Sequence, residues 1–436
     1  MRSRLPLKRE RGKVGPAVIK IVDVLYAVGR SGYFNKDLQA IRAGVRPNGF
    51  SYDGAPRTPG FRRVSQPGEA VSVLLVLEDG QVAFGDCVDV IFTGAAGRDP
   101  LFQAHEHLGV LQTAVRDLLR GRACDSFAPL AAEVDAYRHH SARLHTALRY
   151  GITQALLHAA SLAHRRTVAE VVAGEYQCTI ADRPIPILGM CPTDQLKQVD
   201  KMIMKRVDIL PHGSFANLEQ DVGRHGEKLL DYAGWVARRV RELGEPDYRP
   251  AIHLDVYGTL GELFGEDIER IAGFLGRLQR QVEPLELFIE TPIIAASRSA
   301  QIEAFRALQE ALRQRGHAVK LIADEWCNTL EDIQAFADAA AAHYLQVKTP
   351  DLGGINKTIE ALLYCREKGT GLYLGGSANE TEQSARLCAH IALACRADFM
   401  MCKPGQGVDE GLLILTNEMQ RTLMLLRSRR ASPSIS

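Results

Sequence analysis

The sequence lacks paired cysteine motifs and long apolar runs. Its nine cysteines are scattered, odd in number and never arranged as Cys-x-x-Cys, which argues against a disulfide framework or a zinc site and fits a reducing cytoplasm. No apolar stretch reaches the roughly 18 residues that a membrane-spanning helix needs, because charge or glycine interrupts the longest candidates. We therefore expect a soluble, cytoplasmic protein with no membrane partner.

The sequence also lacks an excess of either charge. Lysine and arginine number 53 against 52 aspartates and glutamates, so no overall field draws in nucleic acid or an anionic membrane, and a small-molecule partner is favoured. Residues 1–20 are locally basic but lack the apolar stretch and cleavage site of a secretory signal. We predict a disordered basic arm over 1–20, with a nucleic-acid-binding tail as the alternative.

The first part of the chain predicts an α+β capping domain over 21–175. Its early part alternates in short apolar runs on either side of Asp79-Gly80, a pattern typical of a β-hairpin. From His105 to about Val172 the periodicity becomes helical. The glycine- and proline-rich stretches between them predict long loops, which in compact domains often close over a site.

The second part predicts a TIM-type (β/α) barrel of seven or eight units over 180–410, so the fold class is α/β. Short apolar runs alternate with amphipathic stretches at intervals close to one strand-helix unit. The runs are IPILGM, VDILPHG, AIHLDVYG, ELFIETP, VKLIADEW, YLQVKTPD, GLYLGGSAN and ADFMMCKPG. Residues 411–430 predict a C-terminal helix that packs back on the capping domain.

Three successive predicted strands end in carboxylates, at Asp255, Glu290 and Asp324. Reacting groups of such barrels sit at the C-terminal ends of the strands, which lie about 4.8 Å apart, so the three acids can converge on one ion. Three hard oxygen ligands suit Mg²⁺. A single acid at such a place more often caps the following helix, but three in consecutive units favour a metal site.

The next predicted strand ends in Gln346 and Lys348, two residues apart and therefore on the same side of the strand. A lysine beside a divalent cation has a lowered pKa and can act as a base; a surface lysine is the alternative. His212 ends the VDILPHG run on the other flank of the ring of strands. It can approach a substrate from the face opposite Lys348, although a lone histidine is more often structural.

Together these residues resemble the enolase superfamily, and within it the 3-methylaspartate ammonia-lyase family. The resemblance runs from Lys20 to Arg430 through motifs such as RLHTALRYGITQA, HLDVYGT, ADEWCNT, VKTPDLGG, GGSANET and KPGQGVDEG. It implies an enolase-like fold, and a homodimer active in amino acid metabolism. It also implies elimination of ammonia from 3-methylaspartate or a related amino diacid, giving mesaconate from 3-methylaspartate, through an enolate stabilised by Mg²⁺.

By position, the resemblance assigns roles to the candidate residues. Asp255, Glu290 and Asp324 would hold the metal, Lys348 would be the base and His212 the acid on the opposite face. Gln346 would contact the metal-bound carboxylate, and Ser377, where the family usually has threonine, would offer its hydroxyl to the second carboxylate.

Three pocket positions depart from the family pattern. Met190 and Ile91 stand where glutamines are typical, and Ala378 replaces a cysteine after Ser377. Each lost amide removes a hydrogen-bond partner for the amino group and its adjacent carboxylate, which usually costs about 1–3 kcal/mol when nothing replaces it. The catalytic groups are therefore expected to be intact in an altered substrate pocket.

Several alternatives stay open on the sequence. The altered pocket favours another enolase-superfamily reaction, a dehydratase, racemase or lyase acting on a different carboxylate. A catalytically dead scaffold would be expected to lack a metal ligand or the base, and neither is missing. The Ala-Ser-Gly run that forms the electrophilic group of other ammonia-lyases is absent, as are GxGxxG and a P-loop. A pyridoxal phosphate enzyme would not explain three carboxylates.

Overall fold

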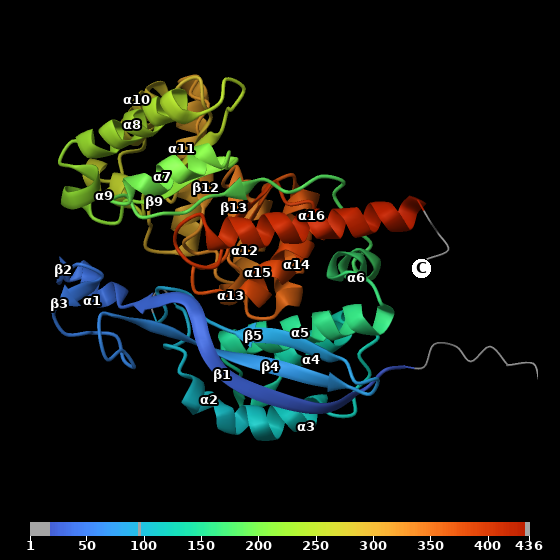
Figure 1. Cartoon of the computed structure of the whole chain (residues 1–436). Helices are drawn as coiled ribbons and strands as arrows, with labels where there is room; N and C mark the ends of the chain where they lie inside the picture. Colours follow the sequence, from blue (N-terminus) through green and yellow to red (C-terminus); the bar gives the residue numbers. More distant parts are fainter. Residues whose placement is uncertain (1–17, 95–96, 432–436) are drawn as a thin grey trace, which may run out of the picture.

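The computed structural model describes residues 18–94 and 97–431. Two parts lie one above the other: a sheet with helices from the first part of the chain, and a barrel from the second (Figure 1). The predicted basic arm falls almost entirely on residues 1–17, outside the described residues. No helix in the described part of the chain is long and apolar enough to cross a membrane.

The capping part is built on an antiparallel sheet in the order β1-β4-β5. Its strands are β1 (Ile21–Lys36), β4 (Ser65–Leu77) and β5 (Val82–Cys87). The predicted turn at Asp79-Gly80 joins β4 to β5, with Gly80 at φ 85°, a conformation that glycine adopts without steric cost. The loop between β1 and β4 contains a small hairpin of β2 (Arg46–Asn48) and β3 (Ser51–Asp53), which the sequence did not predict.

Helix α5 (Thr146–His164) lies directly on this sheet and is buried along most of its length. The close approach needs glycine, because a Cβ on Gly85 would lie 2.2 Å from the carbonyl oxygen of Gly151. The remaining capping elements are α1 (Leu38–Arg42), α2 (Ala104–Val110), η1 (Leu111–Val115), α3 (Arg116–Leu119), α4 (Ala128–Ala136), β6 (Arg138–His139), β7 (Ala142–Arg143) and α6 (Val168–Glu175). The predicted helical region is confirmed apart from the short β6-β7 hairpin.

Eight parallel strands close the barrel in the order β10-β11-β12-β13-β14-β15-β8-β9. They are β8 (Ile187–Leu188), β9 (Ile209–Ser214), β10 (Ala251–Asp255), β11 (Leu287–Glu290), β12 (Lys320–Ala323), β13 (Tyr344–Val347), β14 (Gly371–Leu374) and β15 (Phe399–Met401). Each coincides with one of the eight apolar runs, with β9 extending one residue beyond its run, so the predicted barrel with an α+β cap is confirmed.

The helices between the strands cover the outside of the barrel. In α10 the buried residues Ile271, Leu275, Leu278 and Val282 share one face, as the helical period requires. The barrel-side helices are α7 (Leu196–Met204), η2 (Leu218–Val222), α8 (Glu227–Leu243), α9 (Thr259–Phe264), α10 (Ile268–Val282), α11 (Arg298–Gln314), α12 (Leu330–Asp338), α13 (Thr349–Leu352), α14 (Ile355–Lys368) and α15 (Glu382–Cys395).

The last helix, α16 (Glu410–Ala431), runs along α15 toward α6 (Figure 1). Its Arg429 forms an ion pair with Glu170 of α6 and donates a hydrogen bond to the carbonyl oxygen of Arg165. The C-terminal helix therefore packs on the barrel and contacts the capping part at its far end.

Candidate active site

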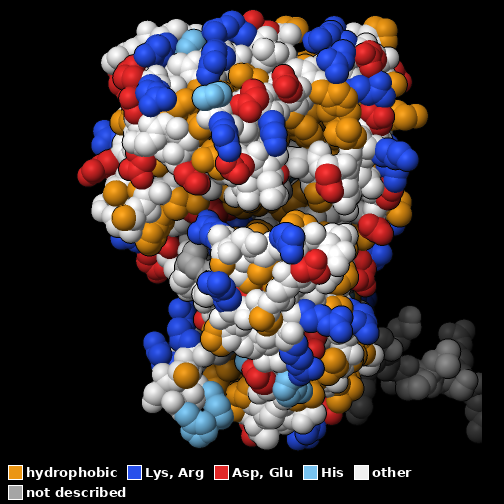
Figure 2. All heavy atoms as spheres, turned by 90° about the vertical axis from the view of Figure 1, so that its left-hand side faces the viewer, with side chains coloured by type: hydrophobic (Ala, Val, Ile, Leu, Met, Phe, Trp, Pro, Cys, Tyr) orange, Lys and Arg blue, Asp and Glu red, His pale blue; other side chains and the backbone are white. Residues whose placement is uncertain are grey.

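A cavity of about 740 Å³ lies at the C-terminal ends of the barrel strands, beneath loops of the capping part. A hollow between the two parts is visible on the molecular face shown in Figure 2, where acidic and basic side chains are interspersed. All ten residues proposed from the sequence line this cavity: Ile91, Met190, His212, Asp255, Glu290, Asp324, Gln346, Lys348, Ser377 and Ala378. The fold thus brings every candidate to one place.

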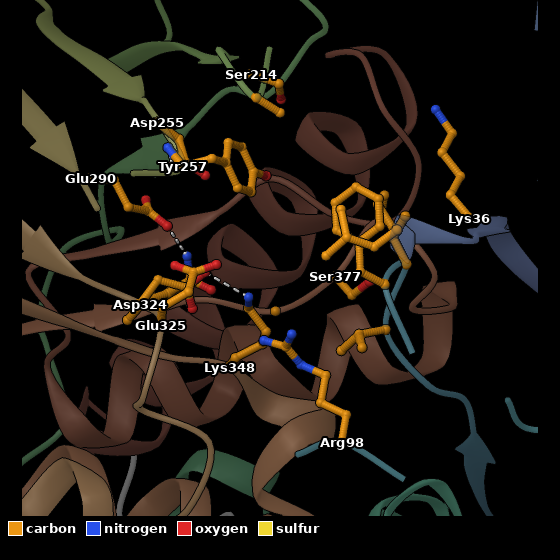
Figure 3. A pocket seen from close by; sticks show the side chains of 18 of the residues that line it. Lys36, Arg98, Ser214, Asp255, Tyr257, Glu290, Asp324, Glu325, Lys348 and Ser377 are labelled. Carbon is orange, nitrogen blue, oxygen red and sulfur yellow. Dashed lines mark hydrogen bonds and ion pairs between the residues drawn. The ribbon is translucent and has the colours of Figure 1, made fainter. Parts of the chain in front are cut away.

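The three predicted metal ligands come from neighbouring strands. Asp255 ends β10 and pairs in register with Glu290, which ends β11, while Asp324 follows β12 directly. Their exposed fractions are only 1%, 0% and 4%. Figure 3 shows the three carboxylates together on one side of the cavity.

A fourth acid, Glu325, joins this group and was not singled out from the sequence. It lines the cavity and accepts a hydrogen bond from the Thr291 hydroxyl at 2.8 Å. Burial, followed by the charge of neighbouring acids, raises the pKa of Asp255 and of Glu290 well above their usual range, and the pKa of Glu325 also rises. So many buried carboxylates are stable as anions only beside compensating positive charge.

Glu290 is the most constrained of these acids. The Gln346 amide donates a hydrogen bond to Glu290 Oε1, and His253 Nε2 lies 2.9 Å from Glu290 Oε2 without the geometry of a hydrogen bond. Among the described residues, Glu290 Oε2 and Gln346 Oε1 are buried oxygens without a hydrogen-bond partner. Unpartnered oxygens inside an acidic cluster are the chemistry that a cation satisfies.

His212, His253 and Glu290 form the group of possible metal ligands whose atoms all lie within 4.8 Å of one another in the described part of the chain. The predicted trio of acids does not form such a group, and like charges at this spacing repel one another. Carboxylate oxygens nevertheless remain the better donors for a hard cation such as Mg²⁺. His253 was missed, although its place two residues before Asp255 puts both side chains on the same face of β10.

Strained turns aim these side chains into the cavity. Four successive barrel units have a non-glycine residue with positive φ at or just after the strand: His212 at 68°, Tyr257 at 44°, Thr291 at 46° and Trp326 at 66°. This conformation is uncommon for residues with a side chain, and such strain clusters at functional sites. The turns reverse the backbone soon after each acid and leave the carboxylates facing the cavity.

Lys348 follows β13 and faces the acids. Its Nζ lies 2.8 Å from Asp324 Oδ2 (Figure 3). Burial is the largest single effect and lowers the Lys348 pKa, but the negative charges around Lys348, with Asp324 first and then Asp351 and Glu325, together outweigh it, so the pKa is raised. Arg98 from a capping loop opposes this increase, and it forms its own ion pair with Asp351 at 2.8 Å.

His212 lies on the other flank of the acids. Its Nδ1 donates a hydrogen bond to the carbonyl oxygen of Gly213 at 2.6 Å, and its ring stacks on His253 with centroids 5.0 Å apart. Burial, and then the charge of His253, lowers the pKa of His212 to about 3. The ring is therefore neutral near pH 7, and its Nε2, 3.9 Å from Asp255 Oδ2, carries no proton.

Comparison with known proteins shows which family the chain belongs to. Models of the methylaspartate ammonia-lyase N-terminus and C-terminus match residues 19–177 and 179–428. The chain is 50% identical to methylaspartate ammonia-lyase 2 of Carboxydothermus hydrogenoformans, covering 94% of this chain and 99% of the relative. The chain belongs to the methylaspartate ammonia-lyase family.

Solved structures agree with this assignment. The Mg-complex of beta-methylaspartase from Clostridium tetanomorphum is 45% identical with a TM-score of 0.90, over 94% of this chain and all of that one. The Citrobacter amalonaticus lyase containing (2S,3S)-3-methylaspartic acid is 46% identical with a TM-score of 0.92, at the same coverage. The predicted family and the ammonia-lyase class are confirmed.

A second buried charge cluster in this ammonia-lyase holds the Ser377 loop. Lys403 and Glu380 form an ion pair at 2.8 Å with both side chains fully buried. Tyr150 from α5 of the cap donates a hydrogen bond to Glu380, and the Ser377 amide donates another at 2.9 Å. Lys403 also donates to the Thr349 hydroxyl and to the Gly375 carbonyl oxygen. This cluster was missed, because single charged residues in GGSANET and KPGQG do not reveal their pairing.

The three altered positions line the cavity with apolar groups. Met190, Ala378 and Met401 are buried in a hydrophobic cluster whose other members lie on the barrel strands, with Ile91 packed against it. Met190 follows β8 of the barrel and Ile91 follows β5 of the capping part, so the packing of the two parts brings them to one cavity. These residues form an apolar wall of the cavity that the acids also line.

Proposed function

We propose that this chain is a Mg²⁺-dependent lyase that releases ammonia from 3-methylaspartate, giving mesaconate, or from a related amino diacid. The observation that carries the proposal is a lysine directly facing buried carboxylates at the barrel mouth. Family membership supports it, since the Citrobacter amalonaticus relative contains 3-methylaspartic acid. The alternative is another reaction of the same superfamily on a different carboxylate, which the apolar Met190 and Ile91 favour.

Asp255, Glu290 and Asp324 are the proposed Mg²⁺ ligands. The excess of buried acids and the unpartnered oxygens of Glu290 and Gln346 fit a divalent cation. When bound, Mg²⁺ supplies positive charge beside the substrate carboxylate and the carbon next to it. With a cation held by these acids, Lys348 would experience less of the negative charge of Asp324 and would more readily be the neutral amine that a base must be.

Lys348 is the proposed base. Its Nζ accepts the proton of the carbon next to the bound carboxylate, and the ammonia then leaves from the following carbon as the double bond forms. Gln346, already donating to Glu290, has its carbonyl oxygen free of hydrogen bonds within the described residues. We assign Gln346 to holding the carboxylate in place, and Ser377 to the second carboxylate through its hydroxyl.

His212 is proposed to act at the amine on the face opposite Lys348. The resemblance implied an acid, but the proton of the neutral ring is on Nδ1, hydrogen-bonded to Gly213. Its Nε2 is therefore an acceptor, which suits holding the substrate ammonium group rather than donating a proton.

The direct test is ammonia release by the purified chain with 3-methylaspartate and Mg²⁺, with mesaconate followed by its absorbance. EDTA should abolish the activity and Mg²⁺ should restore it. Exchange of substrate carbon-bound hydrogen with solvent deuterium separates the alternatives. Exchange without ammonia release would favour another superfamily reaction. The absence of both exchange and release with every amino or hydroxy diacid tested would contradict the proposal.

We further propose a cytoplasmic homodimer. All nine cysteines are free thiols, which suits a reducing compartment, and the family resemblance favours the dimer. Size-exclusion chromatography with light scattering tests the oligomeric state, and a monomer at micromolar concentration would contradict it.

A further inference from the structure

Four cationic side chains line the cavity. Those that already form ion pairs are less available to a substrate carboxylate. An amino diacid brings two carboxylates, of which the acid cluster with its cation takes one. The other carboxylate needs a counter-ion or several hydrogen-bond donors when it leaves water. The lining cations in the described part of the chain are Lys36, Arg42, Arg98 and Lys348.

Two of these cations already have anionic partners. Lys348 pairs with Asp324 and Arg98 pairs with Asp351, both at 2.8 Å. Arg42 is exposed to solvent, where an ion pair contributes little. His212 adds no charge, since its ring is neutral.

Lys36 is different from the other three. It is half-buried at the end of β1, and within residues 18–94 and 97–431 no carboxylate lies within ion-pair distance of its Nζ. Its Nζ lies 5.1 Å from the ring centroid of Phe50 and 5.7 Å from that of Tyr33. Burial lowers its pKa, opposed by the more distant charge of Asp194, so a charged partner that excludes water there would be favourable.

The backbone fixes Lys36 to the altered wall of the pocket. The Lys36 amide donates a hydrogen bond to the carbonyl oxygen of Ile91 at 2.9 Å. Figure 3 shows Lys36 on the far side of Ser377 from the acid cluster. An apolar surface of Ile91, Met190, Ala378 and Met401 lines the same cavity.

The cavity volume fits a ligand longer than an aspartate. Pockets of roughly 300–1,000 Å³ hold drug-sized ligands, and this one measures about 740 Å³. A ligand anchored by one carboxylate at the acid cluster therefore has room for an apolar segment along Met190 and Ile91. Lys36 lines the side of the cavity beyond Ser377, away from the acid cluster (Figure 3), so it is the cation that we assign to the far end of such a ligand.

We propose that Lys36 is the counter-ion for the distal carboxylate of a β-amino dicarboxylate whose chain is longer than that of 3-methylaspartate. The inference rests on the proposed function, because it assumes that the other carboxylate is held at the acid cluster. Elimination still breaks the C–H bond next to that carboxylate and the adjacent C–N bond, so the products are an unsaturated dicarboxylate and ammonia. The distal carboxylate takes no part in the chemistry.

The first experiment measures binding and needs no turnover. Calorimetry on the full Mg²⁺-loaded chain compares succinate, adipate and hexanoate, which share the first carboxylate and differ in the second. Adipate should bind about tenfold more tightly than hexanoate, and Lys36→Met should remove this difference. Lys36→Arg should keep most of it. Three results would each overturn the proposal: Lys36→Met loses equal affinity for adipate and hexanoate, Lys36→Met loses no affinity for either, or the original chain binds succinate more tightly than adipate.

Lys320→Met is the matched control. Lys320 is half-buried, has no ion pair within the described residues, and begins β12 at the opposite end of the barrel. It removes the same charge and should leave the binding of all three acids unchanged. If Lys320→Met weakens adipate binding as much as Lys36→Met does, the effect of Lys36 comes only from the net charge of the protein, and the proposed subsite is overturned.

The second experiment separates this inference from the proposed function. Ammonia release is compared for 3-methylaspartate and 3-aminoadipate with the original chain and Lys36→Met. A loss of kcat/KM confined to 3-aminoadipate supports the subsite. Release from 3-methylaspartate alone, unaffected by Lys36→Met, leaves the function standing and overturns the subsite. Lys36-dependent adipate binding without release of ammonia from either compound overturns the function and leaves the subsite standing.

Discussion

Two clusters of buried charge lie within the same barrel, and they differ in how completely their groups are paired. Glu380 and Lys403 are both fully buried, one acid to one base, with Tyr150, Thr349 and Ser377 completing their hydrogen bonds. The acid cluster at the barrel mouth has four carboxylates, of which Asp324 pairs with Lys348, and buried oxygens there lack hydrogen-bond partners among the described residues.

The difference separates a structural role from a binding role. A paired and hydrogen-bonded cluster gains nothing from a ligand, and it holds the Ser377 loop against α5 of the cap. A cluster with excess negative charge is unstable by itself, because buried like charges repel one another. A cation that binds there relieves this repulsion, and the relief strengthens its binding.

The largest effect is expected at Lys348, the lysine paired with Asp324 in the unbalanced cluster. Lys348→Ala should lower kcat for ammonia release by about 10²–10⁴-fold, the usual contribution of a general base. Lys348→Arg should be nearly as inactive while keeping the charge beside Asp324, because arginine does not lose its proton. Steady-state ammonia release measures both. An active Lys348→Arg would show that charge, and not proton transfer, is what this position supplies.

Glu380→Gln should break the balanced cluster. Removing one partner leaves Lys403 buried without its counter-charge, which should lower the free energy of unfolding by about 3–5 kcal/mol in urea denaturation. Glu303→Gln on the exposed face of α11 should change it by less than about 0.5 kcal/mol. The double variant Glu380→Gln with Lys403→Met should recover part of the loss. If the double variant recovers none of the loss, the destabilisation comes from altered packing and not from the unpaired charge of Lys403.

Removal of metal should affect only the unbalanced cluster. Mg²⁺ at a hundred times its Kd should raise the free energy of unfolding by about 2.7 kcal/mol over the EDTA-treated protein. Asp255→Asn should shrink this increment while making the EDTA-treated protein more stable than the original chain, since one repelling charge is gone. Thermal unfolding with and without Mg²⁺ measures both changes. A less stable metal-free Asp255→Asn would mean that the acids do not repel as described.

The smallest effect is expected on the apolar wall. Met190→Gln returns an amide to the pocket and should lower KM for 3-methylaspartate by roughly fivefold, which corresponds to about 1 kcal/mol from one hydrogen bond. The value of kcat should change less than KM. An unchanged or higher KM would indicate that Met190 does not face the polar groups of this substrate.

The strand pattern predicted the architecture well because each barrel strand is a short apolar run bounded by polar residues. The same pattern predicted that the three acids and Lys348 share one site, since the C-terminal ends of parallel strands lie at one edge of the barrel. Glu325 was missed because only the left-handed turn at Trp326 places two consecutive acids beside one cavity. Lys36 was missed because β1 lies in the capping part, and its end reaches the pocket through contacts that no local pattern records.

The sequence by itself determined the strand order along the chain, the residues at the strand ends and the family to which they belong. It did so because periodicity and strand-end chemistry are local properties. Only the tertiary structure decided which charges are paired, that His212 is neutral, and that Lys36 of the cap lines the pocket without an ion-pair partner in the described part of the chain. Pairing, burial and pKa depend on distances between residues far apart in the chain, and those distances exist only once the cap and the barrel have packed together.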